Sequence, residues 1–85
     1  MDTQDVRKRV RTVVCDMAPL RNTEVVPEAM LREDLGYDSL SLLELAAALE
    51  DEFRFPASAE LDAEVAETVL EVEDIVLAKL QSLAG

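Results

Sequence analysis

The sequence predicts a small all-α protein: a four-helix bundle with three main helices, one short third helix and a long first loop. Apolar residues recur at spacings of three and four along three segments, which is the period of an amphipathic helix. No segment has the pattern of a strand. The chain has 85 residues, of which 49% are apolar, so one domain with a modest core is expected rather than disorder. We expect residues 1–85 to form that single domain.

The first helix is expected to begin at a cap formed by Asp2 or Thr3 and to end before Pro19. Valine is a mediocre helix former, so this helix depends on the packing of one apolar stripe. That stripe consists of Val6, Val10, Val13, Val14 and Met17.

Residues 18–37 form a long connection, and a connection of this length is usually functional or held down by its own side chains. Pro27 suits the first position of a short helical turn that ends near Arg32, and Gly36 marks a break. Five apolar residues are expected to pin the connection to the core: Val25, Val26, Met30, Leu31 and Leu35.

The second helix, from Ser39 to about Phe53, has the clearest pattern. One face is expected in the core and carries Leu42, Leu45, Ala46, Leu49 and Phe53. A second apolar strip, Leu40, Leu43 and Ala47, is more than one core face requires. It indicates either wider burial in the bundle or an exposed patch for a partner, and the spacing favours neither.

Phe55 and Pro56 end this region, and a short third helix is expected from Asp62 to Glu67. Thr68 and Glu71 then have the spacing of a capping box. It starts a last helix whose first turns are acidic, as the helix dipole favours. The acids are Glu71, Glu73 and Asp74, and the inward residues are Val69, Val72, Ile75, Val76, Leu80 and Leu83.

The chain is acidic, with a net charge of −11 and a pI of about 4.2, and the charge is uneven. Residues 1–32 have a net charge of +1 and residues 33–85 a net charge of −12. This balance argues against nucleic acid and anionic membranes as partners and favours basic proteins. On charge alone, a merely solvated acidic surface is the simpler interpretation.

Several classes of protein are excluded. The chain has no apolar run of about 20 residues and no signal peptide. It has no His and one Cys, so it lacks the residues for zinc sites, for an internal disulfide and for Ser-His-Asp or Cys-His catalysis. We expect a cytoplasmic, monomeric protein, encoded as a discrete chain.

One motif carries chemistry: Leu35-Gly36-Tyr37-Asp38-Ser39-Leu40, directly before the second helix. Asp38 or Ser39 can cap that helix, and Ser39 is expected to be exposed. A helix N-terminus favours an added phosphate, so Ser39 is a suitable place for a phosphoester. No base lies nearby to activate the hydroxyl, so another enzyme would have to attach the group. An ordinary helix cap is the simpler alternative.

The stretch from Leu35 to Phe53 resembles the signature of acyl carrier proteins. Leu-Gly-x-Asp-Ser-Leu is matched in full, as are Glu44 and the acidic run Glu50-Asp51-Glu52. The form Leu-Gly-Tyr-Asp-Ser-Leu followed by Leu-Leu-Glu is most similar to free-standing (type II) polyketide synthase carriers. The resemblance implies an acyl-carrier-like bundle with 4′-phosphopantetheine on Ser39, flanked by Asp38 and Leu40. It also implies a non-catalytic carrier, expected as a discrete protein rather than a domain excised from a larger synthase.

The resemblance also implies partners. A phosphopantetheinyl transferase would load the arm, and a ketosynthase and other acyl-processing enzymes with basic patches would dock on the second helix. The residues expected to bind them are Leu43, Glu44, Ala47, Glu50 and Asp51, with Leu40 beside the arm. Fatty-acid and aminoacyl or peptidyl carriers remain alternatives, as does an unmodified acidic interaction module.

The chain departs from the family in two places. Ser41 stands where many fatty-acid carriers have Asp, and Phe53-Arg54-Phe55-Pro56 stands where a Gly and an Ile-Pro-Asp stretch are common. Both departures affect the expected pathway rather than the carrier role. Cys15 is expected to pack as a small apolar residue, Tyr37 to lie partly exposed beside the arm, and the core to be filled rather than open for cargo.

Overall fold

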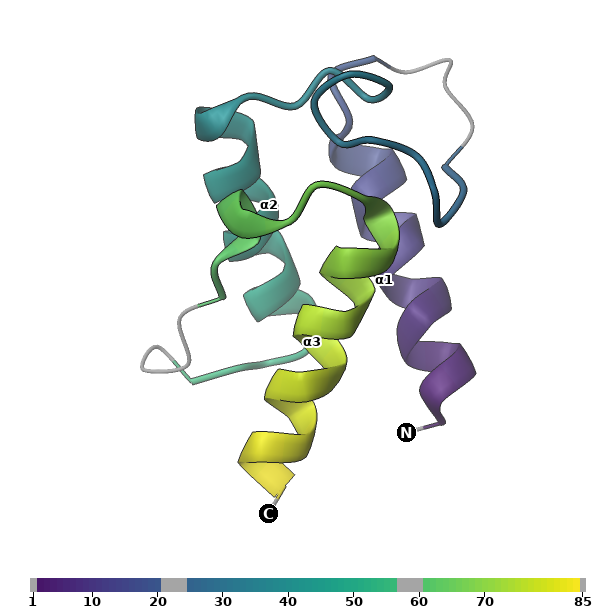
Figure 1. Cartoon of the computed structure of the whole chain (residues 1–85). Helices are drawn as coiled ribbons and strands as arrows, with labels where there is room; N and C mark the ends of the chain where they lie inside the picture. The colour runs from purple at the N-terminus through teal and green to yellow at the C-terminus, as the bar shows by residue number, and fades with distance from the viewer. Residues whose placement is uncertain (1, 21–24, 57–60, 85) are drawn as a thin grey trace.

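The computed structural model describes residues 2–20, 25–56 and 61–84, and these form three α-helices and one short 3-10 helix without a strand. The α-helices are α1 (Thr3–Met17), α2 (Ser39–Glu52) and α3 (Val69–Ala84), and the 3-10 helix is η2 (Ala63–Val65). Both chain ends lie at one end of the molecule, whereas the long loop and the start of α2 lie at the other (Figure 1). No helix in the described ranges is long and apolar enough to cross a membrane.

The core is built from the predicted stripes of the three α-helices. The buried side chains include Val6, Val10 and Val14 of α1, Leu42, Leu45 and Leu49 of α2, and Val69, Val72 and Val76 of α3. Ile75 and Leu80 are half-buried, but Leu83 is 48% exposed. The prediction that Leu83 faces inward is therefore wrong, because the last turn of α3 extends beyond the packed part of the bundle.

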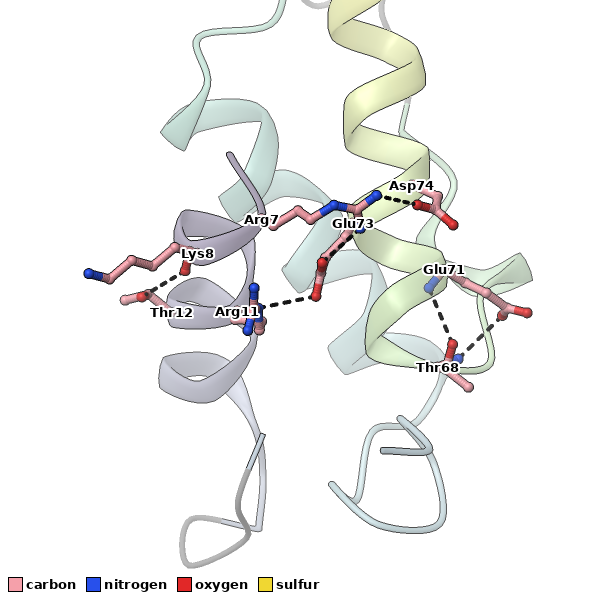
Figure 2. A network of polar contacts seen from close by, with 8 residues as sticks. All are labelled: Arg7, Lys8, Arg11, Thr12, Thr68, Glu71, Glu73 and Asp74. Atoms are coloured by element: carbon pink, nitrogen blue, oxygen red, sulfur yellow. Dashed lines mark hydrogen bonds and ion pairs between the residues drawn. The ribbon is translucent and has the colours of Figure 1, made fainter. Parts of the chain in front are cut away.

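An acidic side chain inside the bundle joins α1 to α3. Glu73 is 1% exposed, and its carboxylate accepts a hydrogen bond from Arg7 Nη1 at 2.9 Å and pairs with Arg11 Nε at 3.3 Å. Arg7 also donates to Asp74 at 3.2 Å. Figure 2 shows both arginines reaching from α1 toward Glu73. Two cations on the facing helix compensate the buried carboxylate. Glu73 therefore links α3 to α1, in addition to its predicted favourable interaction with the helix dipole.

The long loop is tied to the start of α3 by backbone hydrogen bonds. Val69 N–H donates to the Ala29 carbonyl at 3.1 Å and Leu70 N–H to the Pro27 carbonyl at 2.9 Å. Leu31 N–H donates to the Glu67 carbonyl at 2.9 Å, beside an antiparallel bridge between residues 30 and 68. The first amides of a helix lack helical partners, and the loop supplies partners for two of them here.

The helical turn of this loop lies later than predicted. It covers residues 31–35, with the Asp34 and Leu35 amides donating to the Met30 carbonyl at 2.9 and 3.2 Å. The Asp34 carboxylate accepts the Met30 amide at 2.8 Å and closes the turn. Pro27 does begin a turn, which the Ala29 amide closes on the Val26 carbonyl at 3.0 Å. The predicted continuation to Arg32 is wrong, because the carbonyls of Pro27 and Ala29 accept amides of α3 instead of continuing a helix.

The chain turns away from α2 at a left-handed residue, Arg54. Helix α2 ends at Glu52, one residue before the predicted end at about Phe53. Phe55 N–H donates to the Glu50 carbonyl at 2.8 Å and Arg54 N–H to the Asp51 carbonyl at 3.3 Å, with Arg54 at φ +54°. This is the Schellman pattern, in which glycine usually occupies the left-handed position.

The predicted short helix from Asp62 to Glu67 is replaced by η2, which closes with a hydrogen bond from Ala66 N–H to the Ala63 carbonyl at 3.2 Å. Buried Leu61 and Ala66 hold both sides of this turn in the core, so the chain extends before and after it. The predicted capping box is confirmed: Glu71 N–H donates to Thr68 Oγ1 at 3.2 Å, and Glu71 Oε2 accepts Thr68 N–H at 3.3 Å (Figure 2).

Candidate functional site at the start of α2

Gly36 makes the approach to α2 possible. Its φ of +80° lies in the region that favours glycine, and a Cβ placed there would lie 2.8 Å from Leu20 Cγ. Leu20 N–H donates to the Leu35 carbonyl at 3.1 Å, so the segment after α1 and the segment before α2 lie in direct contact. The predicted break at Gly36 is therefore a close crossing of two chain segments.

Asp38, and not Ser39, is the residue that caps α2. Its Oδ1 accepts the Ser41 amide at 2.8 Å, while Ser41 Oγ accepts the Asp38 amide at 2.7 Å. These reciprocal bonds form a capping box. They hold the pKa of the Asp38 carboxyl below its ordinary value, first through the Ser41 amide and then through the Ser41 hydroxyl. Asp38 is thus an anion fixed next to Ser39.

Ser39 is the first residue of α2, and it is exposed. Its hydroxyl has no hydrogen-bond partner among the described residues, because Asp38 and Ser41 cap the helix without it. The positive end of the helix dipole lies at this position and favours a phosphate. An exposed, uncommitted hydroxyl beside a helix N-terminus fits a phosphoester.

Tyr37 is buried, so the prediction that it lies partly exposed is wrong. It is 3% exposed, and its phenol donates a hydrogen bond to the Val14 carbonyl of α1 at 2.7 Å. Burial raises the pKa of the phenol, and the nearby Cys15 thiol adds a smaller increase. The sequence did not signal this contact, because it joins residues 23 positions apart across the bundle.

The second apolar strip of α2 is exposed, which decides between the two interpretations of its spacing. Leu40 is 66% exposed and Leu43 is 57% exposed, and Ala47 is exposed as well. Val65 of η2 adds a further large apolar side chain at 68% exposure. Exposed apolar residues of this size on a small chain indicate a contact surface.

The acids of α2 have different surroundings. Glu44 and Asp51 are exposed, and their carboxylates have no hydrogen-bond or ion-pair partner in the described part of the chain. The Glu50 carboxylate accepts the Leu61 amide at 3.1 Å and so also holds the segment before η2. Glu52 accepts a hydrogen bond from Arg9 Nε at 3.0 Å.

The bases of α1 point mostly to internal partners. Arg7 and Arg11 pair with Glu73, and Arg9 pairs with Glu52 and lies 5.1 Å from the centre of the Phe53 ring. The acids on the outer face of α2 therefore keep their charge toward solvent. Cys15 is exposed on α1, so the prediction that it packs as a small apolar residue is wrong; it lies one position outside the stripe of Val10 and Val14.

The chain was compared with models of known protein families. The model described as "Phosphopantetheine attachment site" matches residues 8–76. The match covers most of the chain, from α1 into α3, and includes the start of α2 with its exposed serine.

Proposed function

The chain belongs to the phosphopantetheine attachment family, and on this basis we propose that Ser39 is the residue that carries the arm. The prosthetic group of this family is a covalently attached 4′-phosphopantetheine, and its domains are in general carriers rather than catalysts. The observation that carries the proposal is the exposed, uncommitted hydroxyl of Ser39 at the first position of α2. Asp38 and Leu40 flank it and would lie beside the arm.

The proposed attachment is a phosphoryl transfer without redox change. The Ser39 oxygen forms a bond to the phosphorus that bears pantetheine in coenzyme A, and the bond from that phosphorus to the 3′,5′-ADP part breaks. The electron pair leaves with 3′,5′-ADP, and the serine proton passes to the transferase or to water. This chain has no histidine, and the Asp38 carboxylate next to Ser39 is held by Ser41 with a lowered pKa, which makes it a weak base, so the transferase supplies the base.

The arm, when bound, supplies a terminal thiol that holds an acyl group as a thioester. The chain's own part is to present that arm on a rigid helix end. The capping box holds the first turn of α2, and the glycine crossing at Gly36 fixes the loop before it. The resulting protein carries cargo and leaves the chemistry to its partners.

We further propose that the partners dock on α2. Carriers of this kind interact with a phosphopantetheinyl transferase and with acyl-processing enzymes. The surface that supports this proposal combines Leu40, Leu43 and Ala47 with the exposed carboxylates of Glu44 and Asp51. Charge complementarity would speed encounters with basic patches more than it would tighten them, which suits a carrier that visits several enzymes.

The proposed pathway is that of a type II polyketide synthase, with a ketosynthase among the partners and the cytoplasm as the place of action. The support is the resemblance of Leu-Gly-Tyr-Asp-Ser-Leu and the following Leu-Leu-Glu to those carriers. Incubation of the loaded protein with a type II polyketide ketosynthase and a malonyl donor tests this. Formation of an extended acyl chain on the arm is expected, and transfer only by fatty-acid enzymes would contradict the pathway.

The carrier role itself is tested by intact-protein mass. The protein is incubated with coenzyme A, magnesium and a broad-specificity phosphopantetheinyl transferase, beside Ser39→Ala and Ser41→Ala. Wild type and Ser41→Ala are expected to gain one phosphopantetheine, and Ser39→Ala none. No gain in the wild type, with a transferase that loads a known carrier in parallel, would contradict the proposal.

A further inference from the structure

The geometry points to Tyr37 as a positioning residue for the proposed attachment reaction: its buried phenol fixes the loop that carries Ser39 against the end of α1. This inference rests on the proposed function of Ser39. It assigns a role to a side chain that lies two residues before the attachment position and does not touch the reacting atoms.

The acceptor of the Tyr37 hydrogen bond is a carbonyl that the helix itself leaves unpaired. The last four carbonyls of an α-helix have no helical amide partner, and α1 ends at Met17, so the Val14 carbonyl is the first of these four. The Ala18 amide, which would be its helical partner, donates instead to the Cys15 carbonyl at 3.4 Å. The Tyr37 phenol supplies the missing donor at 2.7 Å.

The site of this bond makes it costly to lose. Val14 is completely buried and Tyr37 is 3% exposed, so water does not readily replace the phenol. A buried polar group without a partner is penalised more than the net gain from an average hydrogen bond. The bond therefore stabilises the loop in its docked position relative to a displaced one.

Further contacts fix the backbone between this hydrogen bond and Ser39. The Tyr37 amide donates to the Leu31 carbonyl at 3.0 Å, so the backbone of Tyr37 is held as well as its side chain. Gly36 packs against Leu20. Asp38, the next residue, is held by its capping box with Ser41. Each residue from Gly36 to Asp38 thus has a contact that holds it, whereas the Ser39 hydroxyl has no hydrogen-bond partner among the described residues.

The consequence for the reaction is a change in binding rather than in chemistry. If the transferase binds only molecules in which the loop is docked, its apparent affinity is the intrinsic affinity multiplied by the docked fraction. Removing the phenol oxygen lowers that fraction but leaves Ser39, Asp38 and the outer face of α2 unchanged. KM for the carrier should rise while kcat stays the same.

The test compares Tyr37→Phe with Val76→Ala, a core substitution in α3 away from the loop. Urea unfolding of both variants gives their stability, and steady-state kinetics with coenzyme A and a phosphopantetheinyl transferase give KM and kcat. Amide hydrogen exchange of residues 35–38 reports the loop directly. For Tyr37→Phe we expect loop exchange to rise about fivefold or more, because the Val14 carbonyl is left buried without a partner. KM should rise by a smaller factor, because it follows the fraction of molecules in which the loop is docked, and kcat should stay unchanged.

Two results would overturn the inference. One is a Tyr37→Phe protein with wild-type KM and wild-type exchange in residues 35–38. The other is an equal rise of KM in Val76→Ala at equal loss of stability, which would make the effect global. Failure of the proposed function is distinguishable, since the wild type would then not be loaded at all, while hydrogen exchange would still show whether Tyr37 anchors the loop.

Discussion

Glu73 of α3, with 1% of its surface exposed, accepts a hydrogen bond from Arg7 of α1 at 2.9 Å. Arg11, one turn further along α1, pairs with the other carboxylate oxygen at 3.3 Å. The two arginines are partly exposed, whereas the acid is not. The network therefore depends on the arginines to compensate a charge that water does not reach (Figure 2).

This asymmetry predicts different costs for the two sides of the network. Glu73→Gln should lower the free energy of unfolding by about 1–3 kcal/mol, because it weakens the interactions with both arginines. The loss is limited, since the partly exposed arginines can turn to water. Arg7→Gln combined with Arg11→Gln should cost more, because it leaves the buried carboxylate unpaired. Urea unfolding of both proteins measures the difference. A double arginine variant as stable as Glu73→Gln would contradict this account.

Arg54 occupies the left-handed position that ends α2, at φ +54°. Arg54→Gly should raise the free energy of unfolding by about 1 kcal/mol, because glycine adopts this conformation without steric cost. Arg54→Ala is the matched control: it removes the same side chain but keeps the Cβ, and it should give no gain. Thermal or urea unfolding compares the two, and equal stability of both variants would refute the assignment of strain to the Cβ.

The Asp38 carboxyl should titrate below its ordinary value of about 3.9. A lowered pKa means that the charged cap contributes stability above the ordinary value, and that this contribution is lost as the pH falls through the lowered one. Ser41→Ala removes the hydroxyl but keeps the backbone amide, which is the larger cause. In Ser41→Ala, carboxyl carbon NMR shifts should therefore show the Asp38 pKa rising only part of the way back to its ordinary value. No change in the variant would show that the hydroxyl does not hold this carboxylate.

Glu44→Lys should weaken the encounter with basic partners and leave the fold intact, since the Glu44 side chain is exposed and without an ion-pair partner in the described part of the chain. One charge pair at contact in water is worth about 1 kcal/mol, so kcat/KM with the transferase should fall about fivefold or more. The effect should shrink as salt is added. Asp5→Lys makes the same charge change on α1, and an equal loss there would indicate net charge rather than a docking surface.

The sequence predicted best those features that short-range patterns determine. The range of α2 was correct to one residue, because Gly36, Asp38 and the apolar face around Leu45 all act within a few positions of one another. The same is true of the capping box of Thr68 and Glu71. The exposure of Leu43 could not be decided, because periodicity shows which residues share a face but not whether another element covers that face.

What the sequence missed depends on contacts between distant segments. The sequence placed Glu73 only among the acids that the helix dipole favours, and the placement of α1 beside α3 is what brings two arginines to it. Tyr37 reads as a loop residue, and its burial follows from the unpaired carbonyl at the end of α1. The loop carbonyls that cap α3 likewise could not be predicted from propensity, because they are set by the path of the loop.

The proposed attachment of the arm at Ser39 can be located by fragmentation mass spectrometry of the loaded protein. A peptide that spans residues 35–53 is sequenced, and the residue that carries the added phosphopantetheine is read from the fragments. The account predicts the whole modification on Ser39, with Ser41 unmodified. Modification of Ser41, or of a residue outside this peptide, would contradict it.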